Sequence, residues 1–258
     1  MLTNILTSLR MHGALDKLPY AREHIHEREA FAASILEAER EERQIQSISR
    51  RLRYAKFPQK KEWSELDYSF NKDIPLQRLE NLLQGHFVEA KQNLCLIGQQ
   101  GTGKTHCLIA IGREICRKGH NVLFTTASAL VISLEEAKTA GNVSSLMTKL
   151  TKPALLIIDE LGFVPYGPTG TQLLFDVFAK RYEQGSIAVS TNLTFDKWTQ
   201  IFGSIDLTAA LLDRFTQAAT VIPFVGASFR QHKRPTTNKD TAKETTTTQP
   251  QEKMKTTT

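Results

Sequence analysis

The feature that most constrains how this chain can fold is the glycine-rich segment GQQGTGKT at residues 98–105. It matches the pattern GxxxxGK[ST], follows an apolar run at residues 93–97, and opens a helical run at residues 105–117. Glycines permit a loop whose backbone N–H groups turn inward onto phosphate oxygens, and the helix N-terminus adds about half a positive charge there. The segment therefore predicts a phosphate-binding loop between a strand and a helix.

Every residue of this loop is a candidate nucleotide contact. We expect Lys104 to reach the β- and γ-phosphates and the hydroxyl of Thr105 to ligate Mg²⁺, so ATP and Mg²⁺ are the predicted cofactors. A chance match is the alternative, and the strand before the loop and the helix after it disfavour that alternative. The candidate contacts are Gly98, Gln99, Gln100, Gly101, Thr102, Gly103, Lys104 and Thr105.

Four further apolar runs predict the rest of a sheet. Each is continuously apolar rather than alternating, which is typical of parallel strands covered by helices on both faces. Helical segments separate the runs, as in α/β folds. We therefore expect a parallel five-stranded sheet with strands at residues 93–97, 121–125, 154–158, 187–191 and 220–224.

Two carboxylates, Asp159 and Glu160, end the third of these runs. Ligands of open α/β sheets bind at this carboxyl edge of the strands. We expect Asp159 to hold Mg²⁺ through water and Glu160 to orient and deprotonate the attacking water. Two solvated acids that close a buried strand are the alternative.

Two later residues are further candidates. Asn192 follows the fourth run and is placed to sense a γ-phosphate, although a turn or helix cap would favour the same residue type. Arg214 follows a short apolar helix just before the last run. It forms either a surface salt bridge, with Asp213 or another acid, or a contact with a nucleotide bound to a neighbouring subunit.

Composition divides the chain into three predicted parts. Residues 1–60 are rich in Glu, Arg, Ala and Leu and predict long helices, whereas residues 61–234 carry the α/β pattern. Residues 235–258 contain two apolar residues and cannot offset their ordering entropy by burial, so they predict a disordered tail.

Charge and hydropathy bear on partners and location. A basic run without an acid ends the helical part, and it predicts either phosphate contacts to DNA or a solvated helix end. No run approaches the roughly 18–20 apolar residues needed to cross a bilayer, so we expect no membrane contact and a cytoplasmic protein. The basic residues are Arg50, Arg51, Arg53, Lys56, Lys60 and Lys61, interleaved with Tyr54 and Phe57.

The segments GQQGTGKT, LLIIDE, STN and LLDRF, in this order and spacing, resemble the motifs of AAA+ ATPases, specifically their IstB/DnaC-like branch, over about residues 66–230. Three more segments are similar to IstB-like helper ATPases of insertion sequences: LRMHG from residue 9, RRLRYAKFP from residue 50 and DELGFVP from residue 159. The resemblance implies an AAA+ P-loop core preceded by a small all-helical domain.

The resemblance also implies residue roles and partners. Lys104 and Thr105 would be Walker A contacts, Asp159 and Glu160 Walker B, Asn192 sensor 1, and Arg214 an arginine finger acting on a neighbouring subunit. Arg230 lies where a sensor 2 arginine could act, but few residues remain after it to build the usual helical lid. Proteins of this family bind ATP, assemble as homo-oligomers on double-stranded DNA and deliver target DNA to a cognate transposase.

Three other functions compete with this one. A replicative helicase loader of the same branch would share every ATPase motif and use its N-terminal helices to grip a helicase. A P-loop phosphotransferase is disfavoured by Glu160 and Arg214. A DNA-binding scaffold without catalysis would leave the Walker residues idle.

Overall fold

The structure, a computed structural model, describes residues 2–25, 27–66 and 74–226. Arg230 and the predicted tail at residues 235–258 lie outside these residues. None of the described helices is both long and apolar enough to cross a bilayer.

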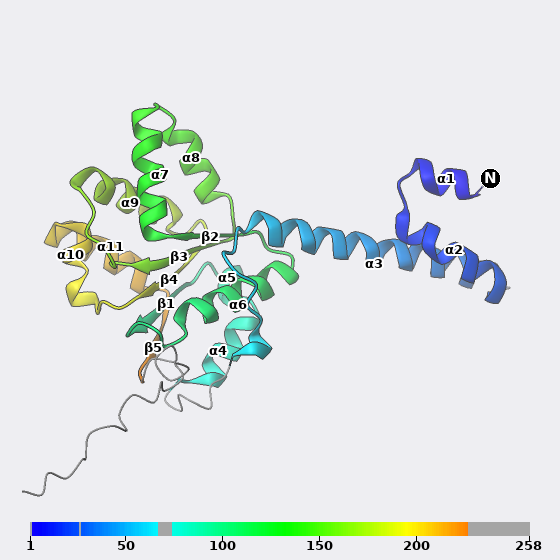
Figure 1. The fold of residues 1–258 in the computed structure, drawn as a ribbon, viewed down its shortest axis with the longest axis horizontal. Coiled ribbons are helices and arrows are strands. Elements are labelled where there is room, and N and C mark those ends of the chain that lie inside the picture. Colours follow the sequence, from blue (N-terminus) through cyan, green and yellow to red (C-terminus); the bar gives the residue numbers. More distant parts are fainter. Residues whose placement is uncertain (1, 26, 67–73, 227–258) are drawn as a thin grey trace, which may run out of the picture.

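All five predicted runs form strands of one parallel sheet, which confirms the α/β prediction (Figure 1). The strand order is β2-β3-β4-β1-β5, so β4 lies between the two strands that carry the loop and the paired carboxylates. The strands are β1 (Asn93–Gly98), β2 (Val122–Thr126), β3 (Leu155–Leu161), β4 (Ser186–Thr191) and β5 (Ala219–Phe224).

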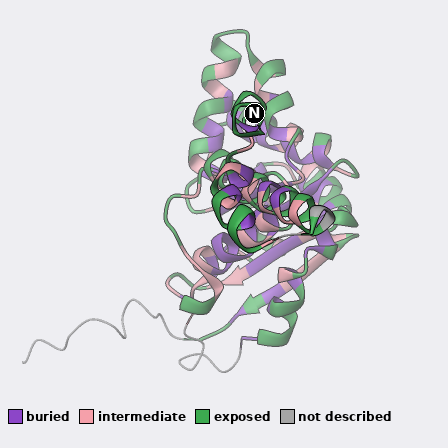
Figure 2. Cartoon of the chain, turned by 90° about the vertical axis from the view of Figure 1, so that its right-hand side faces the viewer, coloured by how far each residue is buried: buried purple, intermediate pink, exposed green. Residues whose placement is uncertain are grey.

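Helices cover both faces of the sheet, which explains why the strands are continuously apolar. In β3, Leu155 and Ile157 pack into one core, while Leu156 and Ile158 pack into the other. Figure 2 shows the strands as largely buried and the outer helix faces as exposed. The first core includes residues of α4 (Leu76–Leu83), α5 (His86–Glu89) and α6 (Lys104–Arg117). The second core includes residues of α7 (Ala127–Thr139), α8 (Val143–Thr151), α9 (Pro168–Arg181), α10 (Thr199–Phe202) and α11 (Ile205–Thr216).

Three helices precede the sheet: α1 (Leu2–Ser8), α2 (His12–His24) and α3 (Arg28–Tyr54). Helix α3 extends away from the sheet and carries α1 and α2 near its far end (Figure 1). The close approach of α2 to α3 requires Gly13, because a Cβ there would lie 2.3 Å from the carbonyl oxygen of Ala38. At its other end, α3 is followed by the fully buried Ala55, whose carbonyl accepts a 2.8 Å hydrogen bond from the backbone N–H of Phe124 in β2.

A buried arginine fastens the amino ends of the strands. Arg181, the last residue of α9, is 1% exposed, and burial lowers the pKa of its guanidinium to about 10, so it stays charged at neutral pH. No described carboxylate forms an ion pair with it. Instead it donates, over 2.7–3.4 Å, to the carbonyl oxygens of Leu150, Thr151, Pro153, Ala154 and Ser186. Arg181 therefore joins the end of α8 to the beginnings of β3 and β4.

We predict that Arg181→Met destabilises the fold by about 3 kcal/mol, because buried carbonyl groups lose their donor. Urea denaturation measures this change. Lys180→Met, at the neighbouring exposed position, serves as the control and should shift the free energy of unfolding by no more than about 0.5 kcal/mol. Equal unfolding midpoints for the two variants would contradict the role of Arg181.

Candidate active site

A cavity of about 550 Å³ lies at the carboxyl ends of the strands. Residues 100–105 of the glycine-rich loop line it, together with Glu160 from β3 and Ser190, Thr191 and Asn192 from the end of β4. Parallel strands deliver their carboxyl ends to one edge of the sheet, so residues about 90 positions apart in the chain meet here. The structure thus brings most of the predicted site residues together.

The glycine-rich loop has the geometry of a phosphate cradle. Gly101 and Gly103 have φ angles of 79° and 97°, which side-chain-bearing residues rarely adopt. Lys104 is 9% exposed, and its Nζ donates to the carbonyl oxygens of Gly98 and Gln99 at 2.7 and 2.6 Å. Gly98 and Gln99 do not line the cavity; a Cβ at Gly98 would lie 2.1 Å from the carbonyl oxygen of Phe224. Packing against β5 therefore requires this first glycine.

Oxygen ligands suited to Mg²⁺ gather around Asp159, which is 3% exposed. The hydroxyl of Thr105 donates to Oδ1 of Asp159 at 3.1 Å, and the hydroxyl of Ser190 donates to the same oxygen. Thr105 lies in the first turn of α6, Asp159 lies in β3 and Ser190 lies in β4. A carboxylate and a hydroxyl from separate elements therefore meet at one point, and this donor set fits a magnesium ion.

A local irregularity directs Glu160 into the cavity. The pairing of β3 with β4 shifts register between Ile158 and Leu161, and Glu160 has a φ of 58°. Its backbone N–H donates to Oγ of Ser190 at 3.0 Å. Bulges of this kind re-aim a side chain, and a strained backbone at a site is held by its surroundings. Ser190 thus fixes both carboxylate residues, a role that its position in the sequence does not reveal.

The two later candidates, Asn192 and Arg214, lie at different cavities. Asn192 is exposed and lines the cavity. Arg214 is also exposed, near the end of α11, but lines a different cavity and forms no ion pair with a described residue. The predicted salt bridge with Asp213 is therefore absent from the described part of the chain.

The segment between α3 and the sheet forms a wall of the cavity that sequence reasoning missed. Lys61, predicted as part of the basic run, lines the cavity, and so do Glu65 of η1 (Trp63–Glu65) and His106 of α6. Burial lowers the pKa of His106, whose ring contacts the carbonyl oxygen of Glu62 at 3.2 Å. Other residues of this wall are Pro58, Gln59, Leu66 and Ile74.

Glu62 holds this wall against α6. Its carboxylate accepts from Arg113 at 2.5 Å and from Arg117 at 2.7 Å. Partial burial alone would raise the pKa of Glu62, but the two guanidinium groups outweigh it and hold that pKa below its ordinary value. Helix α6, which follows the nucleotide loop, and the segment after α3 are thus joined through one carboxylate.

Comparison with known proteins agrees with the fold and the motifs. A family model described as IstB-like ATP binding protein matches residues 8–237. The putative ATP-binding protein of insertion sequence IS5376 from Geobacillus stearothermophilus is 34% identical over 211 residues, 82% of this chain and 84% of that protein. The putative ATP-binding protein of IS21 from Pseudomonas aeruginosa is 32% identical over 210 residues, 81% of this chain and 79% of that protein.

Solved structures show the same fold at low sequence identity. AMPPCP-bound DnaA from Aquifex aeolicus aligns with a TM-score of 0.53 and 18% identity, over 65% of this chain and 50% of that one. DnaI aligns with a TM-score of 0.53 and 19% identity, over 66% of this chain and 90% of that one. These AAA+ neighbours confirm the predicted class of fold.

We predict that Glu62→Gln lowers stability at neutral pH but not in acid. Because the folded pKa of Glu62 lies below its ordinary value, the ion pairs contribute fully above about pH 4.5 and are lost as the pH falls through the folded pKa. Urea midpoints of wild type and variant, measured from pH 7 to pH 3, should therefore converge at the acid end. A difference between the two urea midpoints that stays constant from pH 7 to pH 3 would contradict this role of the Glu62 ion pairs.

Proposed function

The chain belongs to the family of IstB-like ATP-binding proteins, and on that premise we propose that it binds and hydrolyses ATP, assembles as a homo-oligomer on double-stranded DNA and presents target DNA to a cognate transposase. The observation that carries the enzymatic part is the meeting of the glycine-rich loop, Glu160 and Asn192 at one cavity, with Asp159 hydrogen-bonded to Thr105 of that loop. The names of its insertion-sequence relatives support the DNA part.

The polar residues gathered at this site have distinct roles in the proposal. The loop N–H groups and Lys104 bind the phosphates, while Thr105 and Asp159 hold Mg²⁺, which would neutralise charge on the phosphate oxygens. Glu160 accepts a proton from the attacking water, and Asn192 contacts the γ-phosphate. Ser190 positions Asp159 and Glu160 through its two hydrogen bonds.

Arg214 acts on the nucleotide of a neighbouring copy. Within its own chain it lines a cavity other than that of the phosphate loop, and no described acid pairs with it. An exposed guanidinium in such a position can stabilise transition-state charge across an interface. This supports a homo-oligomer in which hydrolysis requires two subunits.

The helical segment at residues 1–60 contacts DNA or the transposase. Arg50 and Arg53 are exposed near the end of α3, and Lys56 and Lys60 are exposed just beyond it, so they are available to phosphates. Arg51 is half-buried, and Lys61 lines the nucleotide cavity. We therefore narrow the proposed DNA contact to the four exposed cations.

A replicative helicase loader remains the second candidate, because it would share every ATPase motif of this chain. The likeness to DnaI concerns the fold alone. The curated relatives quoted above are named as insertion-sequence proteins, which favours the transposition function.

We predict that Glu160→Gln binds ATP as wild type does but hydrolyses it about 10²–10⁴ times more slowly, because a general base is lost while Asp159 and Thr105 remain. Lys104→Ala should instead lose nucleotide binding. Titration with a fluorescent nucleotide and phosphate release measure the two effects. Glu136→Gln, on the exposed face of α7, is the control. If Glu160→Gln bound ATP as poorly as Lys104→Ala, the division of roles would be wrong.

For DNA, we predict that the double variant Arg50→Gln/Arg53→Gln flattens the log–log salt dependence of DNA affinity by roughly 1.8, about 0.9 for each lost phosphate contact. Sequence preference should hardly change, since phosphate contacts position a protein without reading bases. Arg40→Gln, on the same helix beside Glu37, is the matched control. An unaltered slope of the salt dependence in the presence of ATP would mean that DNA binds elsewhere than at the end of α3.

A further inference from the structure

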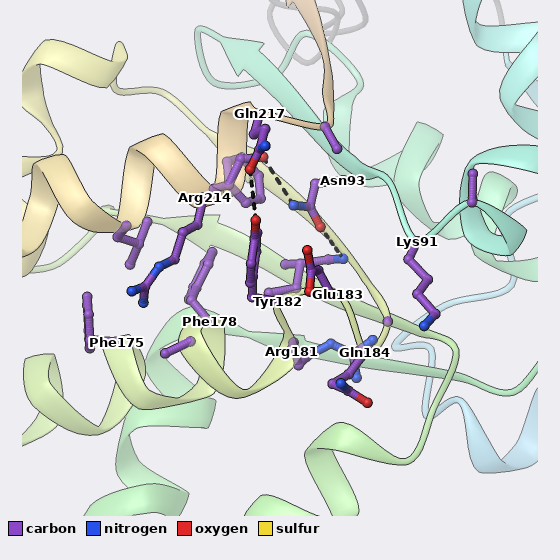
Figure 3. Close-up of a pocket in the computed structure, with 17 residues that line it drawn as sticks. Lys91, Asn93, Phe175, Phe178, Arg181, Tyr182, Glu183, Gln184, Arg214 and Gln217 are labelled. Atoms are coloured by element: carbon purple, nitrogen blue, oxygen red, sulfur yellow. Dashed lines mark hydrogen bonds between the residues drawn. The ribbon is translucent and has the colours of Figure 1, made fainter.

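A second cavity lies away from the nucleotide site. It has a volume of about 720 Å³ and lies at the amino ends of β1 and β4, between α9 and α11 (Figure 3). Its apolar lining comes from Phe175 and Phe178 of α9 and from Leu211 and Phe215 of α11. Arg214 reaches from α11 toward Phe175 and Phe178 (Figure 3). Arg214, which we propose to act on a neighbouring copy, thus lies in a cavity with an apolar wall.

The charges around this cavity favour an anionic partner. Three cations line it, Lys91, Arg181 and Arg214, against one carboxylate, Glu183. Arg181 is buried without an acid among the described residues, and its Nε has no hydrogen-bond acceptor in the structure. The cavity therefore combines an apolar wall with an uncompensated positive charge.

Hydrogen bonds across the cavity hold its walls in place. The hydroxyl of Tyr182 donates to Gln217 at 2.8 Å, and the amide of Asn93 donates to the carbonyl oxygen of Phe215 at 3.1 Å (Figure 3). Asn93 also accepts from the backbone N–H of Ile187 at 2.9 Å. Because these bonds link α9, α11, β1 and β4, the hollow is formed before any partner arrives.

Exposed apolar side chains that complement the cavity around Arg214 lie at the nucleotide cavity. Phe163, which lines it, is 54% exposed, and Val164 beside it is exposed as well. The preceding Gly162 has a φ of 80°, and a Cβ there would lie 2.6 Å from Leu193, so the turn that presents Phe163 is closely packed. Two adjacent large apolar side chains are therefore exposed at this edge of the sheet.

We propose that Phe163 of one copy docks into the cavity around Arg214 of the next copy. The inference rests on the proposed function, in which Arg214 reaches the nucleotide of its neighbour. The residues around Arg214 must then contact the residues around the nucleotide of the other copy. The apolar cavity receives Phe163, while the two exposed cations, Lys91 and Arg214, approach the exposed carboxylate of Glu65 and the bound phosphates.

The contact is head-to-tail. Each copy presents Phe163, at the carboxyl edge of its sheet, to one neighbour. It presents the cavity around Arg214, at the amino edge of its sheet, to the other neighbour, so the interface can be repeated along DNA. Phe163 acts as an anchor that sets the approach of Arg214, and it takes no part in the chemistry itself. Its loss should weaken the assembly of copies.

Cross-linking tests the contact directly. The three native cysteines, Cys95, Cys107 and Cys116, are fully buried, so single introduced cysteines can be joined by a short bismaleimide. Ala218 is exposed and lines the cavity. Mixing full-length Phe163→Cys with full-length Ala218→Cys should give a cross-linked dimer that requires Mg-ATP. Ile132→Cys, at a position 56% exposed on α7, replaces Phe163→Cys in the control mixture and should give none.

Ala218→Trp is the second test, because a large side chain there obstructs the docking cavity and lies outside the nucleotide cavity. Nucleotide binding and sedimentation are measured on the same samples, and we expect unchanged nucleotide affinity and at least a tenfold rise in the protein concentration needed for ATP-dependent assembly, whereas Ile132→Trp should leave assembly unchanged. Assembly of wild type without the specific cross-link, or normal assembly of Ala218→Trp, would overturn the docking inference and leave the proposed function standing. Failure of wild type to bind ATP or to assemble would refute the proposed function and the inference with it.

Discussion

The hydrogen bonds to Asp159 are the interaction on which the arrangement of the site depends. Oδ1 of this carboxylate accepts from Thr105 at the start of α6 and from Ser190 near the end of β4, so three elements converge on one buried oxygen. Ser190 then accepts the N–H of Glu160, whose backbone adopts a left-handed conformation. A buried anion needs such partners. The bulge that directs Glu160 is held by the same hydroxyl that holds Asp159.

The segment after α3 joins the nucleotide cavity to the helices that precede the sheet. Ala55 lies in the first core, Lys61 lines the cavity, and Glu62 pairs with two arginines of α6. These contacts join the helix that follows the phosphate loop to the segment that follows α3.

Much of the fold follows from the sequence, because five continuous apolar runs and one glycine-rich loop predict a parallel sheet whose carboxyl edge carries Lys104, Asp159 and Asn192. Other features depend on tertiary contacts that no local pattern records. The bridging role of Ser190 requires a strand order in which β4 lies beside β3. Lys61 looks like a member of a basic run, and only the path of the chain after α3 brings it to the cavity. Ile45 lies at a position where helical periodicity predicts burial. It is nevertheless exposed, because α3 extends away from the sheet.

In the proposed function, one chain binds ATP alone but hydrolyses it only with Arg214 from a neighbour. The most direct test is the ATPase rate per subunit, measured together with nucleotide affinity over a range of protein concentrations. We expect the rate per subunit to rise from near zero as monomers associate, while the affinity of the monomer for nucleotide remains constant. A rate per subunit that stays constant down to concentrations at which the chain is monomeric would show that Arg214 of a neighbour is not required.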